Sequence, residues 1–221
     1  MKLLPAMTFA TLVALPNFVL AEHDSGSPYR GGPSMYVFGG LSATEYDFEA
    51  SDFRYSFGDG SLSDVQIDNE TNGLRFGVGF GFSPELALEM GFVDLGKLTA
   101  SGVSDGSQVL NNGYSAGRVD MDADVDGVFL GVKVHTPAHE PMGAYARFGV
   151  YAWEFAGTLE DTSRKGKFSV EGTDPYIGIG LRFAVARNAD IQIGYDHYVL
   201  DDDESVNMSA NTLSADFVLR F

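Results

Sequence analysis

The sequence predicts an all-β fold, an eight-stranded antiparallel up-and-down barrel that spans a membrane. Three observations favour this fold. Stretches of about ten residues alternate between large apolar and small or charged side chains, which is the period of a strand with one apolar face. The connections between these stretches alternate between short and long. After the first 21 residues no segment approaches the roughly 20 apolar residues of a membrane helix.

Composition limits the classes of function. The chain has 221 residues, enough for one domain or one barrel, and its formal net charge is −17. An acidic surface repels phosphates, so a nucleic-acid partner is not expected. The absence of cysteine excludes disulfides, zinc-thiolate sites and a thiol nucleophile.

The N-terminal segment predicts export. Residues 1–21 begin with a basic Lys2, continue as an apolar stretch and end in small residues, as a signal peptide cut after Ala21 does. A retained membrane helix is the alternative, which two prolines and the acidic residues that follow disfavour. Residues 22–33 are then a polar periplasmic leader, and residues 34–221 form the barrel.

The alternation places each strand in turn. In 34–48 both faces carry apolar residues, so its phase stays open, whereas in 143–157 the charge of Arg147 is expected inside, with Ala146 and Phe148 outside. The expected strands are 34–48, 74–82, 85–92, 127–135, 143–157, 176–185, 191–198 and 213–221.

The connections orient the barrel. Short turns are expected at 83–85, 136–141 and 186–190, and long polar loops at 49–70, 100–117 and 160–173, with a shorter loop at 201–208. Outer-membrane barrels have short periplasmic turns and longer extracellular loops. With an even number of strands, both ends of the chain are therefore expected on the periplasmic side.

The second face of each strand decides what surrounds the barrel. The apolar positions are uniformly large, and most of their neighbours are Gly, Ala or a single charge. A water-facing surface would be rich in Lys, Glu and Thr, whereas a narrow interior needs small residues beside large polar ones. The apolar face is therefore expected in lipid, and a soluble lipocalin-like barrel is the alternative.

The inward face then carries a set of charges. Because unpaired charges are costly in a confined interior, they are expected to form ion pairs, with Glu89 and Arg75 as one hypothetical pair. The predicted interior set is Arg75, Glu85, Glu89, Lys133, Arg147, Arg182, Asp196, Asp216 and Arg220.

Several segments resemble a known family. "GVGFGFSPELALEMGFVDLG", "AYARFGVYAW", "DPYIGIGLRFAVARNADIQIGYDHY" and the final "LRF" resemble the transmembrane domain of OmpA and the small OmpA-like or opacity-type barrels, over most of residues 34–221. The resemblance implies a Gram-negative outer-membrane location and lipid and lipopolysaccharide as surroundings. It also implies an interior Glu89 paired with basic residues, to which Lys133 and Arg147 correspond. Arg182 stands where the family has its next interior glutamate, and Gln192 lies near an interior arginine of the family.

The resemblance further implies a role for the end of the chain. In OmpA-like barrels a final aromatic residue with alternate apolar residues before it is read by the outer-membrane assembly machinery, and Phe221, Leu219 and Phe217 fit this pattern. OmpA continues into a periplasmic peptidoglycan-binding domain. The strand pattern of this sequence stops at the barrel, so a stand-alone barrel without that domain is expected. It is also expected to be a monomer.

An acidic stretch is a weak candidate for a metal site. Asp120, Asp122, Asp124 and Asp126 recur at every second position, so on a strand their carboxylates share one face. Ca²⁺ or Mg²⁺ prefer oxygen ligands, and such ions could bridge the acids to lipopolysaccharide. The spacing is not that of a calcium-binding loop, and the favoured interpretation is a strand that rises above the membrane into water.

No motif predicts an enzyme or a cofactor. Nucleophilic catalysis needs a hydroxyl beside a histidine and a carboxylate, and only His197, next to Asp196, suggests such a site. Trp153 and Tyr195 are expected in the aromatic girdle at the membrane interface.

The sequence therefore predicts a structural or surface-interaction protein with acidic extracellular loops and an unidentified extracellular ligand. The first alternative is a narrow channel for ions or small solutes, and the second is the soluble ligand-binding barrel.

Overall fold

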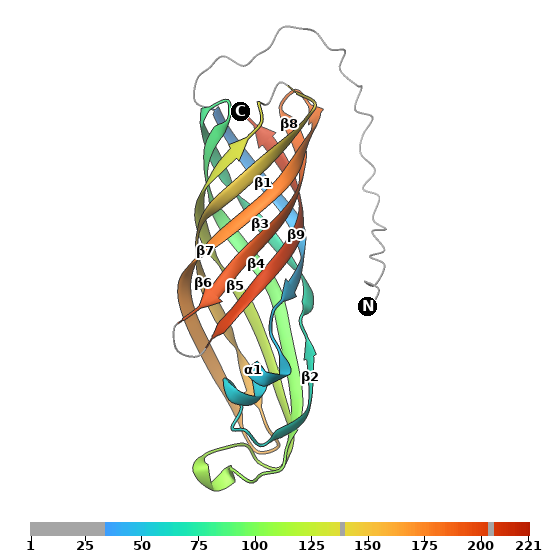
Figure 1. Cartoon of the computed structure of the whole chain (residues 1–221), viewed down its shortest axis with the longest axis vertical. Coiled ribbons are helices and arrows are strands. Elements are labelled where there is room, and N and C mark those ends of the chain that lie inside the picture. The colour runs from blue at the N-terminus through green and yellow to red at the C-terminus, as the bar shows by residue number, and fades with distance from the viewer. Residues whose placement is uncertain (1–33, 138–139, 203–205) are drawn as a thin grey trace.

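A computed structural model describes residues 34–137, 140–202 and 206–221, most of them in antiparallel strands (Figure 1). The predicted signal peptide and leader, and part of the predicted short turn at 136–141, lie outside these residues. No helix in the described ranges is long and apolar enough to cross a membrane. The elements are β1 (Ser34–Tyr46), α1 (Ala50–Tyr55), β2 (Leu62–Asp68), β3 (Glu70–Ser83), β4 (Leu86–Ser104), η1 (Val109–Asn111), β5 (Gly117–His135), β6 (Met142–Glu160), β7 (Lys165–Ala186), β8 (Ala189–Asp201) and β9 (Asn207–Arg220).

The strands close into a ring, which confirms the predicted eight-stranded barrel. The order around the ring is β1-β3-β4-β5-β6-β7-β8-β9, and β9 pairs with β1 from Tyr36 opposite Arg220 to Tyr46 opposite Ala210. This pairing between the first and the last strand closes the barrel. β2 follows on from β3 in space and pairs with β4 beyond the ring.

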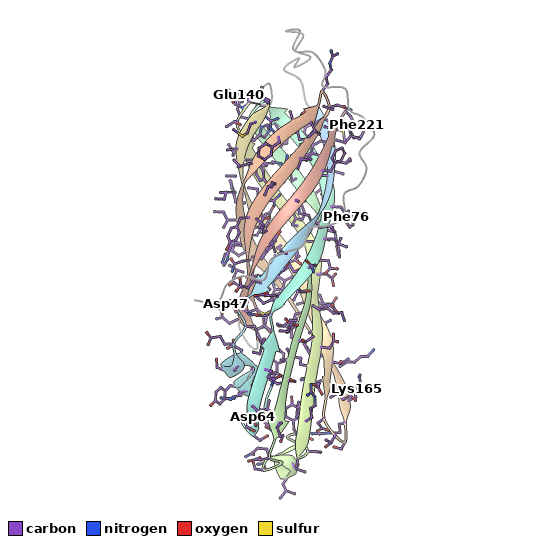
Figure 2. The ribbon with its side chains drawn as sticks, turned by 90° about the vertical axis from the view of Figure 1, so that its right-hand side faces the viewer. Asp47, Asp64, Phe76, Glu140, Lys165 and Phe221 are labelled. Atoms are coloured by element: carbon purple, nitrogen blue, oxygen red, sulfur yellow. The ribbon has the colours of Figure 1, made fainter. Side chains whose placement is uncertain are left out.

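Four strands are much longer than a membrane requires. β4, β5 and β6 each have 19 residues and β7 has 22, whereas a tilted membrane strand needs about 9–11. The excess rises from the end of the barrel opposite Phe221 and Glu140 (Figure 2). We call residues 47–69, 94–126 and 154–174, which form this part and which the predicted orientation places outside the cell, the extracellular extension.

The extension corrects the predicted long loops. Part of 49–70 and of 100–117 and most of 160–173 is regular structure: α1 and β2 lie in the first segment, the end of β4 in the second and the first half of β7 in the third. These segments read as polar because their outward faces meet water, but alternate residues still point into an apolar core.

The outer face of the membrane-spanning part is apolar. Phe76, which points away from β3 in Figure 2, is 55% exposed, and Val78 and Phe80 lie in the same row. An exposed apolar band is not compatible with water, so the soluble barrel alternative is wrong.

The structure also resolves the strand phases. On β6, Arg147 is buried and Phe148 is exposed, as predicted. On β1, Tyr36 and Phe38 point inward and their neighbours point outward. A Cβ atom at Gly79 would lie 2.0 Å from the Tyr36 ring, so glycine is what makes room for the inward phase.

Along the long strands the outward row changes from apolar in the membrane to charged above it. On β5, Val128 and Leu130 face outward in the membrane, and Asp126 and Asp124 continue the same row above it. The inward row of β5 changes in the opposite sense, from Lys133 to apolar residues. On β4 the parity itself changes at a bulge between Asp94 and Gly96, where Gly96 has φ +86°.

Candidate functional site in the barrel interior and the extracellular extension

The centre of the membrane-spanning part holds a four-residue ion-pair cluster. The guanidinium of Arg147 donates to both carboxylate oxygens of Asp196, with 2.5 Å from Nε to Oδ1. Arg75 lies 3.4 Å from Asp196, and Asp216 lies 3.7 Å from each arginine. All four side chains are at most 3% exposed. Two arginines and two aspartates therefore balance one another inside the barrel.

A second cluster lies nearer the periplasmic end. Lys133 Nζ donates to Glu89 at 2.9 Å and to Gln192 at 2.7 Å, and Tyr36 donates its hydroxyl to Glu89 at 2.7 Å. Glu89 pairs with Lys133 while Arg75 pairs with aspartates, so the hypothetical pair of Glu89 with Arg75 is wrong. The register across several strands determines which basic side chain reaches Glu89, and the pattern of one strand does not contain that register.

The periplasmic mouth holds a third cluster. Asp190, fully buried, lies 3.4 Å from Arg182 and also contacts Arg220. Asp190 escaped the sequence analysis because "ARNAD" has the composition of a turn, whereas β8 already begins at Ala189. Glu85 was placed inside wrongly, since it lies in the exposed turn before β4 and bonds with Ser83.

Aromatic side chains fill the interior above the central ion pairs. The Arg75 guanidinium lies 5.1 Å from the ring centroid of Phe38 and 5.3 Å from that of Phe129. Tyr176 contacts Phe129 and stacks on Tyr198 at 5.5 Å. These rings separate the ion pairs from the apolar core of the extension.

Trp153 belongs to this interior and not to a girdle. Its side chain is 2% exposed, and its indole N–H donates to Asp174 at 2.8 Å. The girdle prediction for Trp153 is therefore wrong, because an inward position with a carboxylate partner satisfies the indole. Tyr195 does face outward and is 51% exposed.

The extension has an apolar core of its own. Leu95, Leu98, Met121 and Phe155 are each at most 1% exposed and come from β4, β5 and β6. On the side that the sheet leaves open, α1 inserts Phe53, and Phe57 contacts the rings of Phe155 and Phe168 at 5.6 and 5.3 Å. Figure 1 shows α1 lying across this side.

Two carboxylates hold the tip of the extension together. Asp161 accepts hydrogen bonds from the amides of Ser115, Ser163 and Arg164, and Asp59 accepts from Ser61 and from the amide of Tyr114. Desolvation acts to raise the pKa of Asp161, but these donors outweigh it and lower that pKa well below its usual range. Desolvation likewise acts to raise the pKa of Asp59, but the hydrogen bonds from Ser61 and Tyr114 outweigh it and lower that pKa.

The predicted acidic row lies on the outer face of the extension. Asp120, Asp122, Asp124 and Asp126 point outward from β5, and two of them contact Lys97 of β4, Asp122 at 3.1 Å and Asp124 at 4.0 Å. Asp120 pairs with Arg118 at 2.7 Å. Within the described ranges no group of three or more acidic or histidine side chains is arranged to hold a metal ion.

Carboxylates also mark the level where the apolar band ends. The first charged outward residue above the band is acidic on each of six neighbouring strands, and several of these acids are direct cross-strand neighbours, such as Asp94 opposite Asp126 and Glu154 opposite Glu171. These residues are Glu45, Glu70, Asp94, Asp126, Glu154 and Glu171. Like charges opposite one another repel, so this level carries a concentrated negative potential.

The histidine that suggested catalysis contacts an amide side chain and not the carboxylate of Asp196. Nδ1 of His197 lies 2.9 Å from the side-chain oxygen of Asn211, and Asp196 points inward to the arginines.

Comparison with known proteins decides the family. The model of the OmpA-like transmembrane domain matches residues 35–221. The chain belongs to this family. No curated protein sequence matches it.

Solved structures agree on the fold of this OmpA-like barrel. Neisserial surface protein A shares 13% identity with it, with a TM-score of 0.54 and coverage of 86% of this chain and 99% of the other. For OprG from Pseudomonas aeruginosa the values are 12%, 0.52, 86% and 97%. For the outer-membrane protein AlkL they are 17%, 0.50, 93% and 97%. This OmpA-like barrel therefore lies in the Gram-negative outer membrane, surrounded by its lipids.

Proposed function

We propose that this OmpA-like barrel is a non-conducting, monomeric surface protein that holds a rigid acidic extension outside the cell for contact with extracellular molecules. The observation that carries this proposal is the filling of the interior at successive levels. The three ion-pair clusters occupy the interior from the periplasmic mouth to the centre of the barrel, the Tyr176–Tyr198 stack comes next, and the apolar core around Leu98 and Met121 lies above.

The second support is the stiffness of the extension. Its strands continue the barrel without a break in β5, β6 and β7, and the carboxylates of Asp59 and Asp161 connect its loops. Order of this kind lowers the entropy that a binding surface loses when a partner docks. A surface protein benefits from such order, whereas a pore needs an open path.

The narrow channel remains the alternative, and electrical recording separates the two functions. Purified protein in a planar bilayer is expected to show no steady conductance steps. For the binding comparison described next, a shortened variant replaces residues 99–122 by Asn-Gly. Because Leu98 and Ala123 are paired in the wild-type protein, a two-residue turn between them keeps the register of the β4–β5 hairpin. Regular single-channel steps from the wild-type protein would overturn the proposal.

The interaction role needs a separate measurement. Cells that display the wild-type protein are compared with cells that display the shortened variant at equal folded amount, judged by heat-dependent gel migration. Binding to extracellular ligands is expected only with the complete extension. Equal binding by both would place the interaction outside the extension.

No catalytic role or cofactor forms part of the proposal. The outer-membrane assembly machinery is its expected partner during insertion, through Phe221, Leu219 and Phe217, which form an outward row at the end of β9 with Phe221 78% exposed.

A further inference from the structure

The first half of β7 is an edge strand. β7 pairs with β8 from Tyr176 towards the periplasm, but from Lys165 to Asp174 its ladder within the described ranges is with β6 alone. The pairing with β8 stops at Pro175, which has no N–H to donate to the next residue of β8. The sheet of the extension is therefore open along β7, and Lys165 lies at its outer margin in Figure 2.

The geometry of the ladder tells which backbone groups are unpaired. At its two ends Asp161 donates its N–H to the carbonyl of Arg164, and Ala184 donates to the carbonyl of Pro141, both at 2.8 Å. The register between them has no shift. In an antiparallel pair the bonded positions alternate, so even-numbered residues of β7 bond to β6 and odd-numbered residues point away. The N–H and C=O groups that the β6 ladder leaves unused, and that no other described strand pairs with, belong to Lys165, Lys167, Ser169, Glu171 and Thr173, which are all exposed.

This edge coincides with a basic stretch on an acidic surface. Arg164, Lys165 and Lys167 lie close together in the sequence, whereas carboxylates dominate the outward row at the base of the extension. Lys165 lies 2.8 Å from Glu160, and Lys167 makes no ion pair within the described part of the chain. The inner side of the same edge is apolar, since Phe168 and Val170 are half-buried against the core.

We propose that this edge of β7 accepts an extended peptide, with alternating apolar and acidic residues, as an additional antiparallel strand. The inference rests on the proposed function and names the surface and the class of partner. Backbone groups of the odd-numbered residues hold the strand, Lys167 and Lys165 attract its carboxylates, and Phe168 and Val170 continue the core beneath its apolar residues.

The β4–β5 pair shows the same chemistry inside the molecule. Lys97 on β4 contacts Asp122 and Asp124 of β5, while Met121 and Ala123 of β5 point into the core. The stretch "VDMDADVDG" thus has the pattern that suits a strand with an outward lysine. Lysines on an edge also discourage random strand pairing, and an acidic partner is the kind that they would admit.

The test uses the full-length protein in lipid nanodiscs and a fluorescent synthetic peptide of sequence VDMDADVDG, with binding followed by fluorescence anisotropy. Ser169→Pro removes one N–H from the open edge and none from the β6 ladder. Ser169→Ala is the matched control, because it loses only the 2.6 Å bond from Ser169 Oγ to Glu154 and keeps the N–H. The proline variant is expected to bind at least about fivefold more weakly and the alanine variant within about twofold of wild type.

Charge and backbone are tested separately. Lys167→Glu is expected to weaken binding about three- to tenfold, with most of the difference lost in high salt. A peptide with N-methyl groups on alternate residues is expected not to bind. Each variant must first show the heat-dependent migration of a folded barrel.

Three results would overturn the inference. They are equal binding by Ser169→Pro and wild type, equal binding of the N-methylated peptide, and no binding to the folded wild-type protein at about 1 mM peptide, where even a weak complex forms. A dimer that Ser169→Pro converts to monomer would make a second copy the occupant and would also overturn it. In the first three cases a barrel that conducts no ions leaves the proposed function standing, whereas the dimer would also contradict its monomeric state.

Discussion

Removal of Asp196 tests whether the barrel interior excludes water. Asp196 is fully buried and contacts both Arg147 and Arg75, and the only other carboxylate of the central cluster, Asp216, lies 3.7 Å from each. Asp196→Ala changes this balanced cluster to a net charge of +1. Loss of one partner from a buried ion pair costs about 3–5 kcal/mol. By contrast, the Asp122–Lys97 pair is more than half exposed, and Asp122→Ala should cost about 0.2–1 kcal/mol.

Urea unfolding in lipid vesicles measures both variants. Trp153 is the single tryptophan and lies inside the barrel, so its fluorescence reports unfolding without a label. Adding Arg147→Ala to Asp196→Ala should recover part of the loss, because the second change removes an unpaired charge. A loss below about 1 kcal/mol for Asp196→Ala, close to that of Asp122→Ala, would refute the reasoning. Water in the interior would then screen these charges, and the channel alternative would gain support.

Three further predictions concern the core of the extension, its tip and the last residue. Leu98→Ala should destabilise the extension by about 2–5 kcal/mol and expose it to external protease, because Leu98 is fully buried in its core. At the tip, the lowered pKa of Asp161 means that its stabilisation is present at neutral pH and is lost as the pH falls below about 4. The protection factor of the Ser163 amide against hydrogen exchange should therefore fall in acid in the wild-type protein, and in Asp161→Asn it should be low at every pH. Phe221→Ala should lower the folded fraction in the outer membrane, measured by heat-dependent gel migration, and leave the urea midpoint of the assembled barrel almost unchanged.

Each of these predictions has a control. Leu130→Ala alters an outward, lipid-facing leucine of β5 and should keep protease resistance. An equal loss of protection in acid in Asp161→Asn would assign the pH effect to another group. Phe148→Ala removes another exposed phenylalanine and should insert normally. If it fails as Phe221→Ala does, the defect comes from lost apolar surface and not from the end of the chain.

The sequence predicted well which side chains of a strand point into the barrel, but it predicted their ion-pair partners poorly. Alternation on β6 correctly placed Arg147 inside and Phe148 outside, because neighbouring side chains of a strand point to opposite faces. The same reasoning failed at Glu85, which has the right parity but lies in a turn, and at Trp153, whose inward position depends on Asp174 of another strand. Asp190 was missed because a charged residue near a turn has the same composition whether it points inward or outward.

The sequence by itself determined the strand period, the apolar band and the charged lining, since each follows from side chains a few positions apart. Only the tertiary structure decided that Glu89 pairs with Lys133 and that the supposed loops form an extension with its own core. It also revealed the open edge of β7 above Pro175. These features depend on register between strands, on the bulge at Gly96 and on where lipid gives way to water. Those are relations between distant segments, which one strand's pattern does not contain.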